Sequence, residues 1–151
     1  MHLAGASEVR ENAKVQLAAL ANAVEATRLS LHVLAATVWV GGQLVVAGLL
    51  PTVRSFGADA SKAIARAFGR IQWPAYAVLL MTGIWNVVAV HGGQRSVWNV
   101  VLGAKIAVVV LAGLAAYLHQ RSRTTMWLAL WGAVTALASL GALVLGVLLA
   151  G

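Results

Sequence analysis

Four long apolar runs dominate the pattern of hydrophobic and polar positions along the chain. They cover residues 29–50, 71–91, 97–119 and 125–150. Each exceeds about 18 residues, the length at which an apolar run indicates a transmembrane helix. The first run is predicted to stop at Pro51, because proline ends or kinks a helix. Short connections between the runs make consecutive helices antiparallel neighbours, so the predicted fold is an all-α, up-down bundle of four transmembrane helices.

The segment before the first run, residues 1–28, has a different pattern. Its apolar positions recur at helical spacing, at Ala13, Leu17, Leu20 and Val24. This predicts an amphipathic helix that lies on the membrane or against a partner. A cleavable signal peptide is not expected, since the segment holds acidic residues and lacks a compact apolar core before a small-residue cleavage site. The predicted organisation is an amphipathic segment, 1–28, followed by a transmembrane domain, 29–151.

Composition supports a membrane protein. Hydrophobic residues make up 61% of the 151 positions and charged residues only 10%. A soluble domain of this size has too little polar surface to cover so many apolar residues. The chain has no cysteine, which excludes disulfides, thiolate metal ligands and cysteine nucleophiles. The net charge of +7 does not indicate a nucleic-acid partner, because the basic residues lie in short segments between the apolar runs.

Those basic segments predict the orientation of the chain in the membrane. The first and third connections share one side and hold six basic residues: Arg54, Lys62, Arg66, Arg70, Arg121 and Arg123. The opposite side holds four: Arg10, Lys14, Arg28 and Arg95. The positive-inside rule therefore predicts a protein of the cytoplasmic membrane with both termini outside. Lys62, Arg66 and Arg70 fall four residues apart, as on a helix face that contacts anionic lipid headgroups, and Pro74 is expected near the start of the second helix.

Polar side chains at membrane depth are costly, so each is a candidate functional residue. His32 begins a stripe that continues through Ala36, Trp39 and Gln43, all on one helical face. An imidazole, an indole N–H and an amide would be unsatisfied against lipid, so we expect this face to point into the bundle. Gly41 and Gly42 follow, and they allow a neighbouring helix or a flat ligand to approach the backbone.

Two further histidines and one lysine complete the candidates. His91 ends the second run on the same side of the membrane as His32, so the topology can bring these two metal-ligand side chains together. His119 lies at the opposite face beside a charged connection, where an interfacial role is favoured. Lys105 is eight residues into the third run, and no acidic residue lies in any of the four runs to pair with it. We expect it to face a ligand or a polar interior.

The ordered motifs "H……WVGG……P…R", "P……TG" and "LGAKIAVV" resemble the copper resistance D (CopD) family and the related HemJ group of four-helix membrane proteins. The resemblance covers residues 30–123. It implies a membrane protein that handles copper, or one that binds haem, with His32 as the ligand histidine and Lys105 as the functional lysine. No oxidase reaction is assigned on this basis, and the chain is not expected to be an enzyme.

The two ligands make different demands on the residues. Cu(I) prefers thiolate and thioether ligands, so copper would have to rest on His32 and His91. Haem b needs one or two axial histidines, a flat apolar slot and a cation for its propionates, which His32 with His91, the double glycine, and Lys105 or Arg95 could provide. The expected cofactor site is built on His32, Trp39, His91 and Lys105. Copper and haem therefore stay open as cofactors. The alternative is a small non-enzymatic accessory subunit whose amphipathic segment docks on a larger membrane complex. A homo-oligomer also stays open.

Overall fold

The computed structural model describes residues 3–90 and 96–150, and throughout these ranges the chain is helical apart from short turns. The elements are α1 (Leu3–Ala36), a π-helical turn η1 (Thr37–Gly41), α2 (Gly42–Ser55), α3 (Ala58–Val90), α4 (Ser96–Arg121) and α5 (Thr125–Ala150). Within the described residues, four helices are long and apolar enough to cross a membrane. The predicted all-α transmembrane architecture is confirmed.

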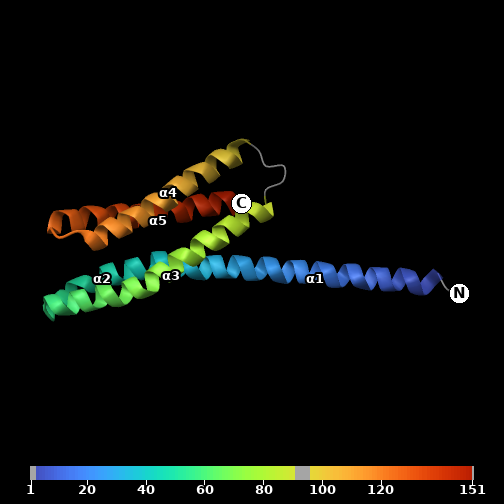
Figure 1. Ribbon diagram of the computed structural model, residues 1–151, viewed down its shortest axis with the longest axis horizontal. Helices are drawn as coiled ribbons and strands as arrows, with labels where there is room; N and C mark the ends of the chain where they lie inside the picture. Colours follow the sequence, from blue (N-terminus) through green and yellow to red (C-terminus); the bar gives the residue numbers. More distant parts are fainter. Residues whose placement is uncertain (1–2, 91–95, 151) are drawn as a thin grey trace.

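α1, η1 and α2 follow one another without an intervening turn, so the amphipathic segment and the first span form one long rod (Figure 1). No break marks the predicted boundary after residue 28. The prediction that the helix stops at Pro51 is wrong: Pro51 lies inside α2, which runs to Ser55. Proline removes only one backbone donor, and the chain reverses instead at Gly57, whose φ of 102° suits glycine.

The first connection is shorter than its sequence suggests. α3 begins at Ala58 rather than near residue 71, so the basic stretch with Lys62, Arg66 and Arg70 is helical. Asp59 in the first turn suits the positive end of the helix dipole, and alanines at every second or third position favour helix over loop. Pro74 consequently lies well inside α3. The prediction that it lies near the start of the helix is wrong.

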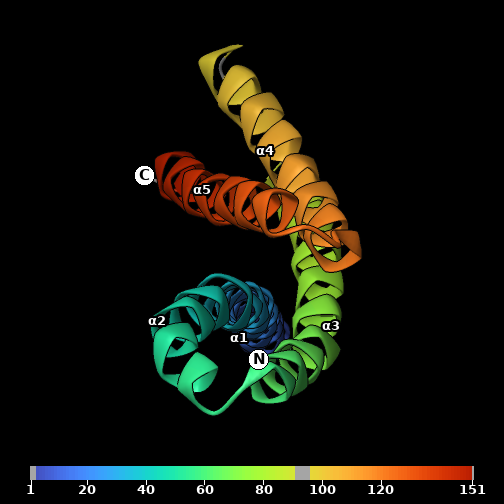
Figure 2. The same cartoon turned by 90° about the vertical axis from the view of Figure 1, so that its left-hand side faces the viewer.

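The helices pack as two antiparallel hairpins that together form the up-down bundle. One hairpin is the first rod against α3, and the other is α4 against α5. The turns after α2 and after α4 lie at one end of the molecule, while α1 begins and α5 finishes towards the other (Figure 1). Seen along the long axis, α5 and the first rod lie on the same side of α3 (Figure 2). This arrangement faces η1 towards α5, where the two hairpins meet.

The core between the hairpins is built from one indole and small side chains. Trp39 and Val40 of η1 pack with Ala112 and Ala116 of α4 and Ala138 of α5. Small residues allow helix axes to approach closely in lipid, where no hydrophobic force drives them together. Large apolar side chains cover the outside instead, among them Leu44, Leu137, Val144 and Val147. Such a surface is stable against hydrocarbon and not against water, which agrees with a multi-pass membrane protein.

Candidate functional site

His32 is held in place by a hydroxyl group on the neighbouring helix. Its Nδ1 lies 2.8 Å from Thr82 Oγ1 on α3. The Thr82 hydroxyl is 2.7 Å from the Val78 carbonyl oxygen, to which it donates its single proton. With the Thr82 proton on the Val78 carbonyl, Oγ1 accepts from His32; in that tautomer Nδ1 carries the proton and Nε2 has a lone pair. Histidines that bind metals are oriented in this way, by a hydrogen bond from the nitrogen that does not coordinate.

The surroundings of His32 combine a glycine with a cation. A methyl group on Gly83 of α3 would lie 3.8 Å from Cε1 of His32, so this glycine contributes little bulk beside the ring. Lys105 of α4 is near enough for its charge to act on the imidazole. The Lys105 ammonium lies against α5, since a methyl group on Gly146 would come within 3.1 Å of Nζ. A histidine of α1 and a lysine of α4, which come from separate apolar runs, therefore interact through charge.

Trp39 forms the centre of a polar layer that is separate from the surroundings of His32. Its indole N–H donates to Ser139 Oγ of α5 at 2.8 Å, and Nε2 of Gln43 approaches the same oxygen at 3.4 Å. Trp39 is only 3% exposed and Ser139 only 2%. The predicted inward direction of the His32, Trp39 and Gln43 stripe is confirmed, because His32 and Trp39 each bond another helix from within the bundle.

The π-helical turn η1 gives this layer its shape. η1 covers Thr37–Gly41 and buries both Trp39 and Val40, which are adjacent in sequence. A π-helix has a wider turn than an α-helix, so two consecutive side chains can face the same neighbour. Such turns are frequent at functional sites. At its end, Gly42 leaves room for the ring of Phe68 on α3, which a methyl group would overlap.

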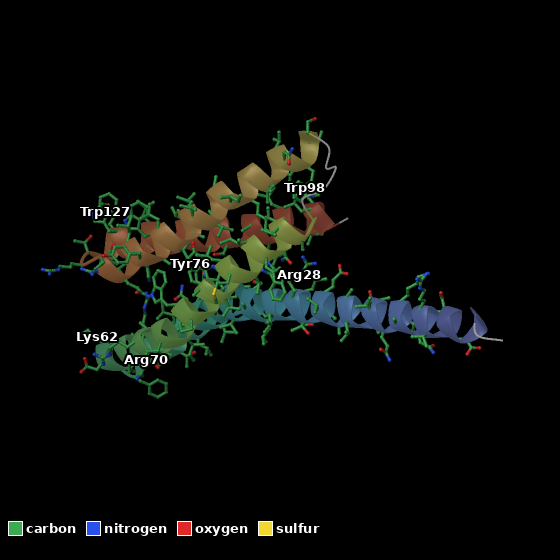
Figure 3. The ribbon with its side chains drawn as sticks, turned by 45° about the vertical axis from the view of Figure 1, so that its right-hand side comes forward. Arg28, Lys62, Arg70, Tyr76, Trp98 and Trp127 are labelled. Atoms are coloured by element: carbon green, nitrogen blue, oxygen red, sulfur yellow. The ribbon has the colours of Figure 1, made fainter. Side chains whose placement is uncertain are left out.

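Tyr76 and Trp73 extend the layer across α3. The Trp39 and Tyr76 rings lie 4.5 Å apart between centroids, and Trp73 packs edge-on against both. Tyr76 donates its hydroxyl proton to the Val109 carbonyl of α4 at 2.9 Å, and Figure 3 shows it between α3 and the α4–α5 hairpin. Trp73 donates to Gln120 Oε1 of α4 at 3.0 Å. These bonds connect the two hairpins and separate His32 from the far end of the bundle.

The other two histidines differ in what can be said of them. His91 lies outside the described residues, so its predicted pairing with His32 stays a prediction. His119 lies far from His32 in the fold, at the opposite end of the bundle. Its Nδ1 is 2.8 Å from the Leu128 carbonyl oxygen, and Gly132 of α5 leaves room for its ring. These contacts give His119 a role in joining α4 to α5.

No group of three or more His, Asp or Glu side chains that could hold a metal ion occurs among the described residues. The site therefore offers one imidazole, a nearby ammonium and an apolar, aromatic interior. This donor set suits an anionic cofactor that needs one nitrogen ligand and a cation for its carboxylates.

Sequence reasoning did not identify Ser139, Tyr76 or Trp73 as partners in these layers. Ser139 carries a hydroxyl group within the most apolar run. Because polar groups are costly in lipid, this position could have been identified as one that faces the bundle interior. Tyr76 and Trp73 flank Pro74, and their sequence gives no sign of which helix they meet. Arg28 was counted only as a charge of the tail, but it is 5% exposed.

Comparison of the chain with protein-family models, curated proteins and solved structures finds no match. The resemblance to the CopD family and the HemJ group therefore stays a prediction that rests on short motifs.

Proposed function

We propose that this multi-pass membrane protein binds haem b, with Nε2 of His32 as an axial ligand. The observation that carries the proposal is the hydrogen-bond chain from His32 through Thr82 to the Val78 carbonyl. This chain favours the tautomer in which Nε2 of His32 is the nitrogen that would coordinate iron. Bound haem would supply one-electron redox chemistry.

Lys105 supplies the second feature that haem needs. No acidic side chain lies in the α4 or α5 sequence, so the ammonium has no carboxylate on its own hairpin. A haem propionate is a carboxylate that would relieve this cost within the membrane. In this proposal His32 and Lys105 thus contact the same ligand. The predicted role of His91 as a second ligand concerns a residue outside the described ranges.

Copper is the weaker candidate at this site. The chain has no cysteine, and Cu(I) favours thiolate and thioether sulfur. The part of the chain that the structure describes contributes one imidazole here and no group of three ligands. A single nitrogen suffices for axial ligation of haem but not for tight capture of a copper ion.

The experiment is an absorption spectrum of the detergent-purified protein from cells supplied with a haem precursor. The wild type is expected to show a Soret band, and His32→Ala is expected to lose it. His119→Ala is the matched control, because that ring bonds the backbone at the other end of the bundle and should leave the band unchanged. A wild type without haem, or a His32→Ala variant with an unchanged spectrum, would overturn the proposal.

An accessory-subunit role is the second candidate, and one observation favours it. Val9, Leu17, Leu20 and Val24 stay exposed along the N-terminal part of α1, which extends well past the other helices (Figure 1). An amphipathic helix without a covering neighbour is suited to a partner or a membrane surface. Stoichiometric co-purification of another membrane protein, lost when residues 3–20 are removed, would support this role, and a chain that purifies alone would count against it.

A further inference from the structure

A groove lies where α1 enters the bundle and passes the last turns of α3. It has a volume of about 420 Å³ and opens to the outside of the molecule. One wall comes from α1 and the other from Trp85 and Ala89 of α3. The residues that line it are Leu20, Ala21, Val24, Glu25, Arg28, Trp85 and Ala89. We call this feature the Arg28 groove.

Arg28 is the more buried of the two charged side chains that line the groove, Arg28 and Glu25. It is 5% exposed and lies between α1 and α3, where Figure 3 labels it. Its Nη2 is 3.6 Å from Glu25 Oε1, a long ion pair whose carboxylate partner is 61% exposed. Its Nη1 is buried without a hydrogen-bond partner among the described residues. A buried guanidinium N–H without an acceptor is costly, since a charged donor loses its water.

The usual explanation for an arginine at a membrane boundary is that its side chain extends to water. The burial of Arg28 argues against it, because a guanidinium that reached water would be exposed. The arginine instead lines a groove whose other surfaces are mostly apolar. An anion in this groove would satisfy Nη1, and an apolar body attached to it would cover Trp85, Ala89 and Val24.

We infer that the Arg28 groove binds the acidic head group of a membrane-embedded amphiphile, with the Arg28 guanidinium as the anion ligand. Arginine is suited to this role because its planar donors match two oxygens of a carboxylate or phosphate. Two sources share this chemistry. One is the phosphate of an anionic lipid. The other is a propionate of a haem held by His32, and this second source rests on the proposed function.

Both sources are compatible with the position of Arg28 on α1. It lies four residues before His32, about 6 Å along the helix axis, so one bound molecule could contact both. A lipid would instead enter from the bilayer, since the groove is open to the outside of the bundle.

The test measures the binding of two probes to the purified full-length protein. Phosphatidylglycerol binding is measured by native mass spectrometry, with phosphatidylcholine as the zwitterionic control. Hemin binding is measured by absorption titration in lipid-free detergent. Arg28→Gln is expected to weaken one of them by roughly ten- to hundredfold, the value of a hydrogen bond to a charged group. Arg10→Gln is the matched control, because Arg10 is exposed on the same helix and outside the groove.

Two further variants keep the proposal testable if Arg28→Gln folds poorly. Ala89→Leu fills the groove from an exposed position and leaves Arg28 intact, so it should also weaken binding. Glu25→Gln removes the competing carboxylate and should tighten binding.

Loss of phosphatidylglycerol alone identifies the lipid, and loss of hemin alone identifies the propionate. If the wild type binds no hemin but binds phosphatidylglycerol through Arg28, the proposed function fails and this inference stands. Equal affinities of the wild type, Arg28→Gln and Ala89→Leu for both probes would overturn it.

Discussion

In the proposed haem site, Thr82 would determine which nitrogen of His32 is free, although it carries no charge and would not touch the iron. Its hydroxyl bonds Nδ1 of His32 and the Val78 carbonyl at the same time. A methyl group in place of the hydroxyl would leave the ring without its support. The proposed ligand role of the imidazole therefore depends on a residue of another helix.

Thr82→Val is expected to lower haem affinity by about 10- to 100-fold, the usual effect of losing a residue that orients a metal ligand. Valine has nearly the same shape, so the fold should persist. Thr135→Val is the matched control: Thr135 is equally buried at 5%, and its hydroxyl oxygen has no partner among the described residues. Hemin titration of both variants checks the prediction, and equal affinities in the two would contradict it.

At the scale of the helices, close approach at glycine determines how the hairpins fit. Tyr76 of α3 reaches the α4 backbone beside Gly113, and a methyl group on Gly113 would overlap the tyrosine hydroxyl and ring. The Tyr76 ring cannot easily move aside, because it also packs at a tilt against the ring of Trp39.

Gly113→Ala is therefore expected to destabilise the protein by about 1–3 kcal/mol, as overpacking does. Gly103→Ala on the same helix has no atom within 4 Å of the added methyl group, and it should be neutral or stabilising because alanine favours helix. Thermal unfolding in detergent, followed by circular dichroism, compares the two. A Gly113→Ala variant as stable as Gly103→Ala would show that Tyr76 does not pack there.

Hydrophobic periodicity predicted the four spans because lipid requires long, continuous apolar helices, and the third and fourth matched within two residues. Helix ends in water follow other rules, so Pro51 and the start of α3 were misplaced. The partners of His32 and Trp39 depend on helix rotation and on the π-helical turn. Neither is encoded in hydropathy, so Thr82 and Ser139 were not predicted as their partners.

In the whole molecule, the up-down order puts the turns after α2 and α4, with the basic residues around them, at one end, and it puts the start of α1 and the end of α3 towards the other. Lys62 and Arg70 lie near the turn after α2 in Figure 3. The charge distribution predicts that this end faces the cytoplasm. The His32 site and the Arg28 groove would then belong to the outer half of the membrane.

This orientation can be tested by labelling because the chain has no native cysteine. Asn12→Cys and Thr124→Cys place single thiols at exposed positions on the two sides without changing any charge. In intact spheroplasts a membrane-impermeant maleimide should label Asn12→Cys, whereas Thr124→Cys should react only after permeabilisation. The reverse pattern would invert the topology and place the His32 site in the cytoplasmic half.

Chemical rescue of His32→Gly is the sharpest test of the proposal that His32 binds haem through Nε2. Glycine removes the imidazole and leaves a space for free imidazole to enter. The variant, titrated with hemin, should lack the Soret band of the wild type and regain it as imidazole is added. If the band persists in His32→Gly without imidazole, or if imidazole does not restore it in a folded variant, His32 is not the haem ligand.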